Sequence, residues 1–123
     1  SQWQPDVVVI NLFQNDKWLV PKMDTVPTPD EIVAAYKAFV TSIRDAYPDA
    51  HIVCALGSMD ASEPGNPWPG YVEKAVAELH AAGDENVSTC FFPFDGFRKH
   101  PRVRHHERNA ALLTAHIREQ MGW

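Results

Sequence analysis

The sequence has no apolar run close to the roughly 20 residues that a membrane-spanning helix requires. Residues 1–5 (SQWQP) also lack the basic and apolar regions of a signal peptide. Basic side chains are in the minority, with 11 lysine and arginine residues against 16 acidic ones and a formal net charge of -5. Because nucleic-acid-binding surfaces are rich in lysine and arginine, we expect neither a nucleic-acid partner nor a membrane partner.

Cysteine is also scarce. The two thiols, Cys54 and Cys90, are too few for a disulfide framework, and both lie within apolar runs, where small buried thiols are common. Cysteine usage therefore does not determine the compartment in which the protein works, and we make no prediction of localisation.

Apolar residues, by contrast, make up 45% of the 123 residues, which is enough for the core of one compact domain. Three short runs rich in β-branched residues predict buried strands: 6–13 (DVVVINLF), 51–57 (HIVCALG) and 87–94 (VSTCFFPF). Pro93 cannot donate a hydrogen bond to a sheet, so the third strand should end at or before it.

Three helices are predicted between and after the strands. Thr28, Pro29 and Glu31 have the spacing of a helix start, and the apolar face that follows should end at Pro48. The predicted face consists of Ile32, Tyr36, Phe39, Ile43 and Tyr47. A second helix is predicted over 70–82, with Val72, Ala75, Val76 and Leu79 inward and Gly83 as its left-handed cap. A third is predicted over 103–121, with one face formed by Val103, His106, Ala110, Leu113, Ile117 and Met121.

Alternation of strands and helices is typical of right-handed crossover units. It predicts an α/β domain with a parallel sheet between helical layers, a three-layer flavodoxin-like architecture. Ligands bind such sheets at the carboxyl ends of the strands. The segments that follow the strands, 17–26, 62–69 and 95–102, are therefore expected to be loops that form the rim of a site.

Two positions that follow predicted strands carry residues suited to catalysis. The amide of Asn15 is a neutral donor that can stabilise an oxyanion. His100 precedes Pro101, so it favours an extended loop from which its imidazole can act as a general base. Asparagine after a strand and histidine before proline are also ordinary turn and loop residues, so the spacing alone leaves both readings open.

Longer stretches around these residues resemble a known family. The run PDVVVINLFQND resembles the third sequence block of the SGNH hydrolases, and HPRVRHHERNAALL resembles their fifth block. The runs YKAFVTSIRDAYPDAHIVCALG and YVEKAVAEL are similar to the acetylesterase branch, above all carbohydrate esterase family 2. The resemblance implies a serine esterase that removes acetyl groups from carbohydrate, or cleaves another small acyl ester, without a cofactor.

The same resemblance assigns roles to single residues. It implies that Asn15 belongs to the oxyanion hole and that His100 is the base that activates a serine. His106 fills the place of a second histidine in the fifth block, but it lies on the predicted apolar stripe, so we expect it to pack and to cap the preceding loop. The family's aspartate three residues before the base is Phe97 here, and Asp95 is the candidate replacement that orients His100.

The Gly-Asp-Ser block that carries the family's nucleophile, and the second block, are not found in this chain. We therefore expect residues 1–123 to be the carboxyl-terminal part of a single SGNH hydrolase-like domain, a partial domain of three β-α units that is inactive alone. The alternative is a non-catalytic binding or interaction domain derived from the same fold.

Other candidates remain within the chain. Ser58, after the second strand, is a possible local nucleophile. A metal site built from His100, His105, His106 and Glu107 fits poorly because adjacent helical residues point about 100° apart, so we expect no metal. Trp18 and Trp68 fall in the predicted rim loops, where an indole either stacks on a sugar or covers the edge of the core.

The first predicted strand also implies a partner. Residues 7–10 (VVVI) are apolar on both faces, as in a central parallel strand, and carry no lysine or proline to protect an edge. In the family that this chain resembles, another strand lies beside this one. We therefore expect the strand to pair with a missing upstream segment or with a second copy of the chain.

Overall fold

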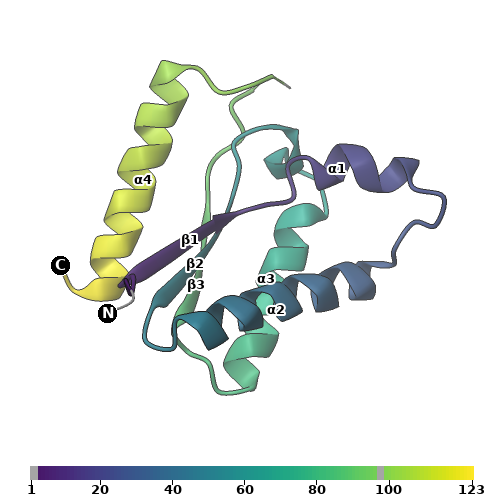
Figure 1. The fold of residues 1–123 in the computed structure, drawn as a ribbon. Helices are drawn as coiled ribbons and strands as arrows, with labels where there is room; N and C mark the ends of the chain where they lie inside the picture. Colours follow the sequence, from purple (N-terminus) through teal and green to yellow (C-terminus); the bar gives the residue numbers. More distant parts are fainter. Residues whose placement is uncertain (1–2, 97–98) are drawn as a thin grey trace.

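Three parallel strands form the centre of the molecule. The structure, a computed structural model, describes residues 3–96 and 99–123. Strands β1 (Val7–Asn11), β2 (His51–Leu56) and β3 (Val87–Phe91) are hydrogen-bonded in the order β1-β2-β3 (Figure 1). The main helices are α2 (Pro29–Ala46), α3 (Trp68–Ala81) and α4 (Val103–Met121). The predicted α/β fold with a parallel sheet is confirmed, and β3 ends before Pro93 as predicted.

Helices cover both faces of this sheet. Helices α2 and α3 lie against one face and α4 against the other (Figure 1). The larger core, on the α2 and α3 side, includes Ile52, Leu56 and Val72, each completely buried. The smaller core, on the α4 side, joins Val53 and Ala55 of β2 to Leu113 and Ile117. The predicted three-layer arrangement is therefore confirmed.

Helix α2 begins as the sequence predicted, but its buried face is different. The Thr28 hydroxyl accepts a hydrogen bond from the backbone of Glu31 at 3.2 Å, and the Glu31 carboxylate accepts one from the backbone of Thr28 at 2.7 Å. The buried residues are Ile32, Val33, Tyr36 and Val40. Phe39, predicted to be buried, is 45% exposed, because Val33 and Val40 turn toward the sheet in its place.

Helix α4 has the predicted bounds, but its amino-terminal half is rotated relative to the prediction. His105 and Asn109 are buried there, whereas Val103 is 74% exposed and His106 faces solvent. Polar side chains can occupy the inner face because they find hydrogen-bond partners. The Nδ1 atom of His105 accepts from the backbone of Arg102 at 3.0 Å, and Asn109 bonds to Ser58.

The first two segments predicted as loops are partly helical. Residues 17–26 include most of α1 (Asp16–Leu19) and the whole of a 3-10 helix, η1 (Val20–Lys22). A second 3-10 helix, η2 (Asp60–Ser62), follows β2, and α3 begins at Trp68, two residues earlier than predicted. These short helices lie between the strands and the main helices that follow, so part of the predicted rim is helical.

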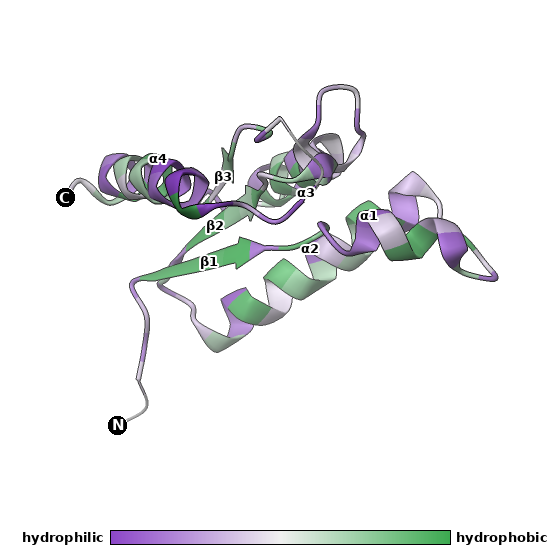
Figure 2. Ribbon diagram, turned by 90° about the horizontal axis from the view of Figure 1, so that it is seen from above, coloured by the Kyte–Doolittle hydropathy of each residue, from purple (hydrophilic) through white to green (hydrophobic). Residues whose placement is uncertain are grey.

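Strand β1 lies at an edge of the sheet. Among the described residues it pairs with β2 alone, and Val9 is 41% exposed. Figure 2 shows apolar colour along β1. The predicted apolar edge is thus present in this chain. In the part of the chain that the structure describes, no helix combines the length and apolar character needed to cross a membrane.

Candidate active site

A cavity of about 460 Å³ lies at the carboxyl ends of the strands, between the start of α4 and the β1–α1 connection. Each of the three strands leads into its wall, and α4 closes it. The lining residues are Asn11, Gln14, Asn15, Gly57, Met59, Phe92, His100, Pro101, His106, Asn109, Ala110 and Leu113. The structure therefore brings Asn15 and His100, predicted from opposite ends of the sequence, to one cavity.

Asn15 is presented to this cavity by a sharp turn after β1. Phe13 adopts a left-handed backbone with φ of 78°, a strained conformation for a bulky residue. Its ring is nevertheless buried against Tyr36 and Trp68, at centroid distances of 4.9 and 5.1 Å. The backbone oxygen of Asn15 accepts from the amides of Trp18 and Leu19, while its side chain makes no capping hydrogen bond to α1. The amide of Asn15 is thus not used to begin the helix.

The residues around Asn15 are tied to η2 by a buried carboxylate. Asp60 has no exposed surface and accepts from Gln14 Nε2 at 2.7 Å and from Lys17 Nζ at 2.5 Å. Burial alone would raise the pKa of the Asp60 carboxyl. The hydrogen bond and charge of Lys17, with the hydrogen bond from Gln14, outweigh burial and lower this pKa below its usual value. Asp60 is therefore ionised at neutral pH.

Three histidines near the start of α4 have different surroundings. His100 and His106 are exposed and line the cavity, whereas His105 is buried beneath them. The prediction that His106 packs in the core and caps the preceding loop is wrong, because His105 takes the capping contact with Arg102. Periodicity favoured His106 since it fell in step with apolar residues, and periodicity does not detect a buried polar cap.

Ser58 does not face the cavity. It is completely buried, and its hydroxyl accepts from Asn109 Nδ2 at 3.1 Å, which joins α4 to the end of β2. The backbone amide of Asp95 donates to the carbonyl of Ser58 at 2.9 Å, so the segment after β3 is held at the same point. Among the described residues the cavity wall includes His100 but not Asp95. Phe97 and Arg98 lie outside the described residues.

Sequence reasoning missed two other groups at the cavity. Asn11 donates from Nδ2 to the carbonyl of Gly57 at 3.4 Å, and Asn109 lies opposite on α4. A polar residue near the end of the apolar run VVVIN was the available signal for Asn11. Asn109 gave no such signal, because its partner Ser58 is distant in sequence.

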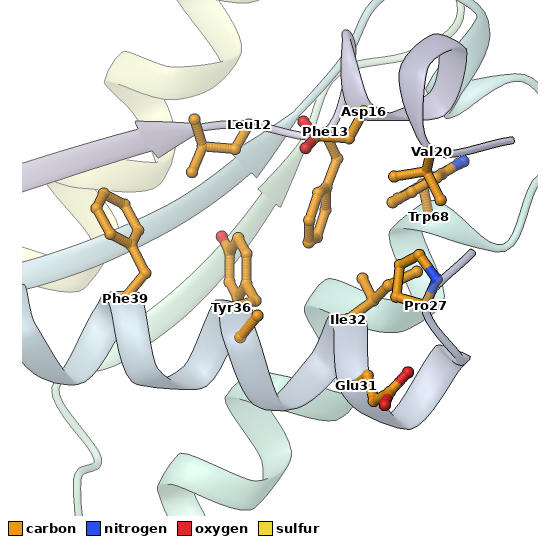
Figure 3. A pocket seen from close by; sticks show the side chains of 11 residues that line it. Leu12, Phe13, Asp16, Val20, Pro27, Glu31, Ile32, Tyr36, Phe39 and Trp68 are labelled. Atoms are coloured by element: carbon orange, nitrogen blue, oxygen red, sulfur yellow. The ribbon is translucent and has the colours of Figure 1, made fainter. Parts of the chain in front are cut away.

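The two candidate tryptophans are separated by the structure. Trp18 is 47% exposed on α1, with Lys17 Nζ 4.6 Å from its ring centroid. Trp68 was expected in a rim loop, but it begins α3 and is only 6% exposed. It lines a second, apolar cavity of about 270 Å³ between the β1–α1 connection and α2 (Figure 3). Trp68 therefore covers the core edge, the alternative given for it above.

The described residues also contain no group of three or more histidine, cysteine or acidic side chains placed to hold a metal ion. His105 and His106, members of the metal alternative considered from the sequence, occupy a buried and an exposed position respectively. The side chains that meet at the cavity are a histidine pair and several amides, a set suited to proton transfer and to hydrogen bonding of an oxyanion.

No protein-family model matches the chain. In sequence it is 33% identical over 129 residues to the cellulase/esterase CelE of Acetivibrio thermocellus, covering 100% of the chain and 15% of CelE. A solved family two carbohydrate esterase from Clostridium thermocellum, in complex with cellohexaose, matches with a TM-score of 0.83 and 33% identity. That match covers 98% of this chain and 38% of the other. The solved structures that this chain matches at 33% identity are family-two carbohydrate esterases.

A further relative is an acetylxylan esterase / glucomannan deacetylase of Cellvibrio japonicus, 25% identical over 122 residues, which cover 99% of this chain and 33% of that protein. The resemblance to family-two acetylesterases that the sequence predicted is thus confirmed. The chain spans well under half the length of each of these three relatives.

Proposed function

We propose that this chain supplies the base and an oxyanion-hole donor of an SGNH-type serine esterase that removes acetyl groups from carbohydrate. The observation that carries the proposal is the meeting of Asn15 and His100 at one cavity. The names of the relatives, which include an acetylxylan esterase, support acetylated carbohydrate as the substrate class. No cofactor is required for this chemistry.

In the proposed reaction His100 takes the proton of a serine hydroxyl as that oxygen attacks the acetyl carbonyl. The carbonyl oxygen gains negative charge in the tetrahedral intermediate, and Asn15 Nδ2 donates a hydrogen bond to it. His100 then gives the proton to the departing sugar oxygen, which leaves an acetyl-serine. Water, deprotonated by His100, attacks the acetyl-serine; as the tetrahedral intermediate collapses, His100 returns that proton to the departing serine oxygen, which releases acetate and restores the serine hydroxyl.

Two further residues fit supporting roles. Asp95 is proposed as the acid that orients His100, because it is half-buried in the same β3–α4 connection and its backbone is held by Ser58. Trp18 is proposed as a sugar contact, because it is exposed on the helix that directly follows Asn15. Trp68 has no such role in this proposal because it is buried.

We also propose that residues 1–123 are the carboxyl-terminal part of one SGNH-like domain whose nucleophile lies outside this stretch. The completely buried position of Ser58 supports an external nucleophile. The open edge of β1 supports a neighbouring strand, supplied by an upstream segment or by a second copy of the chain.

Substitutions in the full-length protein test the proposed site. Asn15→Ala should lower kcat by about 10²- to 10³-fold on an acetylated xylo-oligosaccharide, and His100→Ala should lower it by about 10⁴-fold or more. His106→Ala, the matched control on the same cavity wall, should cost far less than His100→Ala. The isolated 123-residue chain should be inert toward p-nitrophenyl acetate.

Other results would contradict this proposal. Full activity in both Asn15→Ala and His100→Ala would favour the non-catalytic binding domain, and a larger loss in His106→Ala would reverse the roles of the two histidines. Turnover by the isolated chain that disappears in Ser58→Ala would place the nucleophile within this stretch.

A further inference from the structure

The β1–α1 connection is held from both sides of Asn15 by the same carboxylate. Gln14 immediately precedes Asn15 and binds one oxygen of Asp60, Oδ1, at 2.7 Å. Lys17 follows two residues later and binds the other oxygen, Oδ2, at 2.5 Å. Both oxygens of a fully buried acid are thus directed to the residues that flank the proposed oxyanion donor.

Asp60 is itself fixed in place, so it can serve as an anchor. It begins η2, directly after the segment that leaves β2. Its backbone carbonyl accepts from Asn66 Nδ2 at 2.8 Å and from the amide of Glu63 at 3.1 Å. The carboxylate therefore has a defined position relative to the central strand of the sheet.

This turn needs an anchor because its backbone is strained. Phe13 has φ of 78°, and such conformations persist only where the surroundings hold them. A buried ion pair contributes little to stability compared with apolar packing, but it defines geometry because each charge must keep its partner. The ring of Phe13 packs on one side of the turn, and the Asp60 carboxylate binds the polar residues Gln14 and Lys17 of the same turn.

We infer that Asp60 is a positioning residue that holds the amide of Asn15 in place for the oxyanion, an inference that rests on the proposed function. Asp60 does not touch the substrate. It acts through Gln14 and Lys17, which fix the turn, so its loss should be felt as a displaced or mobile Asn15 side chain. Oxyanion hydrogen bonds act in the transition state, so the loss should appear in kcat and leave KM nearly unchanged.

The first test needs no activity. In the full-length protein labelled with ¹⁵N-asparagine, the side-chain amide signal of Asn15, assigned with Asn15→Gln, reports its mobility. Asp60→Asn, of nearly equal volume, should broaden or shift that signal. The control Glu78→Gln, which removes a different ion pair, between α2 and α3, should leave it unchanged. An Asn15 signal that is identical in wild type and Asp60→Asn overturns the inference.

The second test is a double-mutant cycle in the full-length esterase. Asp60→Asn should lower kcat by up to about 100-fold, since small displacements of a catalytic group cost this much. In the Asn15→Ala background the same substitution should have no further effect, because the group it positions is already gone. Losses that simply multiply would show that Asp60 acts elsewhere and would overturn the inference.

The two tests separate this inference from the proposed function. If Asn15→Ala leaves kcat unchanged, the proposed function fails, and the amide signal still decides whether Asp60 holds Asn15. If Asp60→Asn does not fold, Gln14→Ala removes one of the two anchors while the ion pair with Lys17 remains. It should then produce a smaller change in the same direction, and an unchanged Asn15 signal there would count against the inference.

Discussion

Gly57, at the end of β2, allows two backbones to meet at the floor of the site. Its φ of 131° is rarely adopted by residues with a side chain. A Cβ atom placed there would lie 2.5 Å from the carbonyl oxygen of Phe92 and 2.9 Å from the Cβ of Phe92. Both residues line the cavity, so its shape depends on the absence of a side chain at position 57.

Gly57→Ala should therefore destabilise the chain by about 2 kcal/mol or more, because strain and overpacking add. Gly70→Ala is the matched control. Gly70 lies within α3, where an added Cβ meets nothing within 4 Å, so alanine should raise stability by about 0.5–1 kcal/mol. Urea unfolding measures the free energy of unfolding of each variant. Similar values for Gly57→Ala and Gly70→Ala would contradict the prediction.

At the scale of elements, a chain of polar side chains, of which His51 is buried and Ser88 and His116 are half-buried, joins β2, β3 and α4 on the side of the smaller core. His51 Nε2 lies 2.7 Å from Ser88 Oγ, which in turn lies 2.7 Å from His116 Nε2. Burial lowers the pKa of His116, the nearby His51 lowers it further, and Glu119 partly opposes the change. The folded chain therefore favours a neutral His116.

This network predicts an acid-sensitive stability. The pKa of His116 is lower in the folded chain than its value of 6.5 in the unfolded chain. The stability that neutral His116 contributes is therefore fully present above pH 6.5, and it is lost as the pH falls through the pKa of the folded state. His116→Gln keeps a polar partner for Ser88 and removes this titration. The difference in unfolding free energy between about pH 7.5 and about pH 5.5 should be smaller in His116→Gln than in wild type. An equal difference in both proteins would contradict the role of His116.

The elements also show where sequence reasoning succeeds and where it stops. Apolar runs and the Thr28 capping box identified the strands and the start of α2, because these signals are local. The meeting of Asn15 and His100 followed from parallel topology, which brings strand ends to one edge. The burial of Asp60 was not predictable, because its partner Lys17 lies 43 residues away. Asn109 was missed for the same reason, since only the folded chain brings it to Ser58.

At the scale of the whole molecule, β1 pairs on one side only among the described residues, and exposed apolar residues lie on the strand and near its end. Val9 is 41% exposed on the strand, while Leu12 and Phe39 are 40% and 45% exposed beside the apolar cavity (Figure 3). An unprotected edge strand with apolar neighbours is a template for pairing with another strand. This is the surface that we propose to be covered by an upstream segment or by a second copy.

The isolated chain should therefore self-associate through β1. Light scattering should show a mass that rises with concentration, and Val9→Lys should reduce the association because lysine disfavours pairing at an edge. Val26→Lys replaces a residue that is 55% exposed before α2, away from the strand, and should leave the association unchanged. A stable monomer at high concentration would contradict this prediction.

The docking of α4 has a consequence for how the molecule opens. This helix is held by two half-buried apolar residues, Leu113 and Ile117, and by polar bonds such as Asn109 to Ser58, whereas α2 and α3 share the larger core. Amide protons of α4 should accordingly exchange with solvent through a partial opening that leaves the sheet intact. Because α4 forms one wall of the cavity, this partial opening would disrupt the site while the sheet and the helices on its other face remain folded.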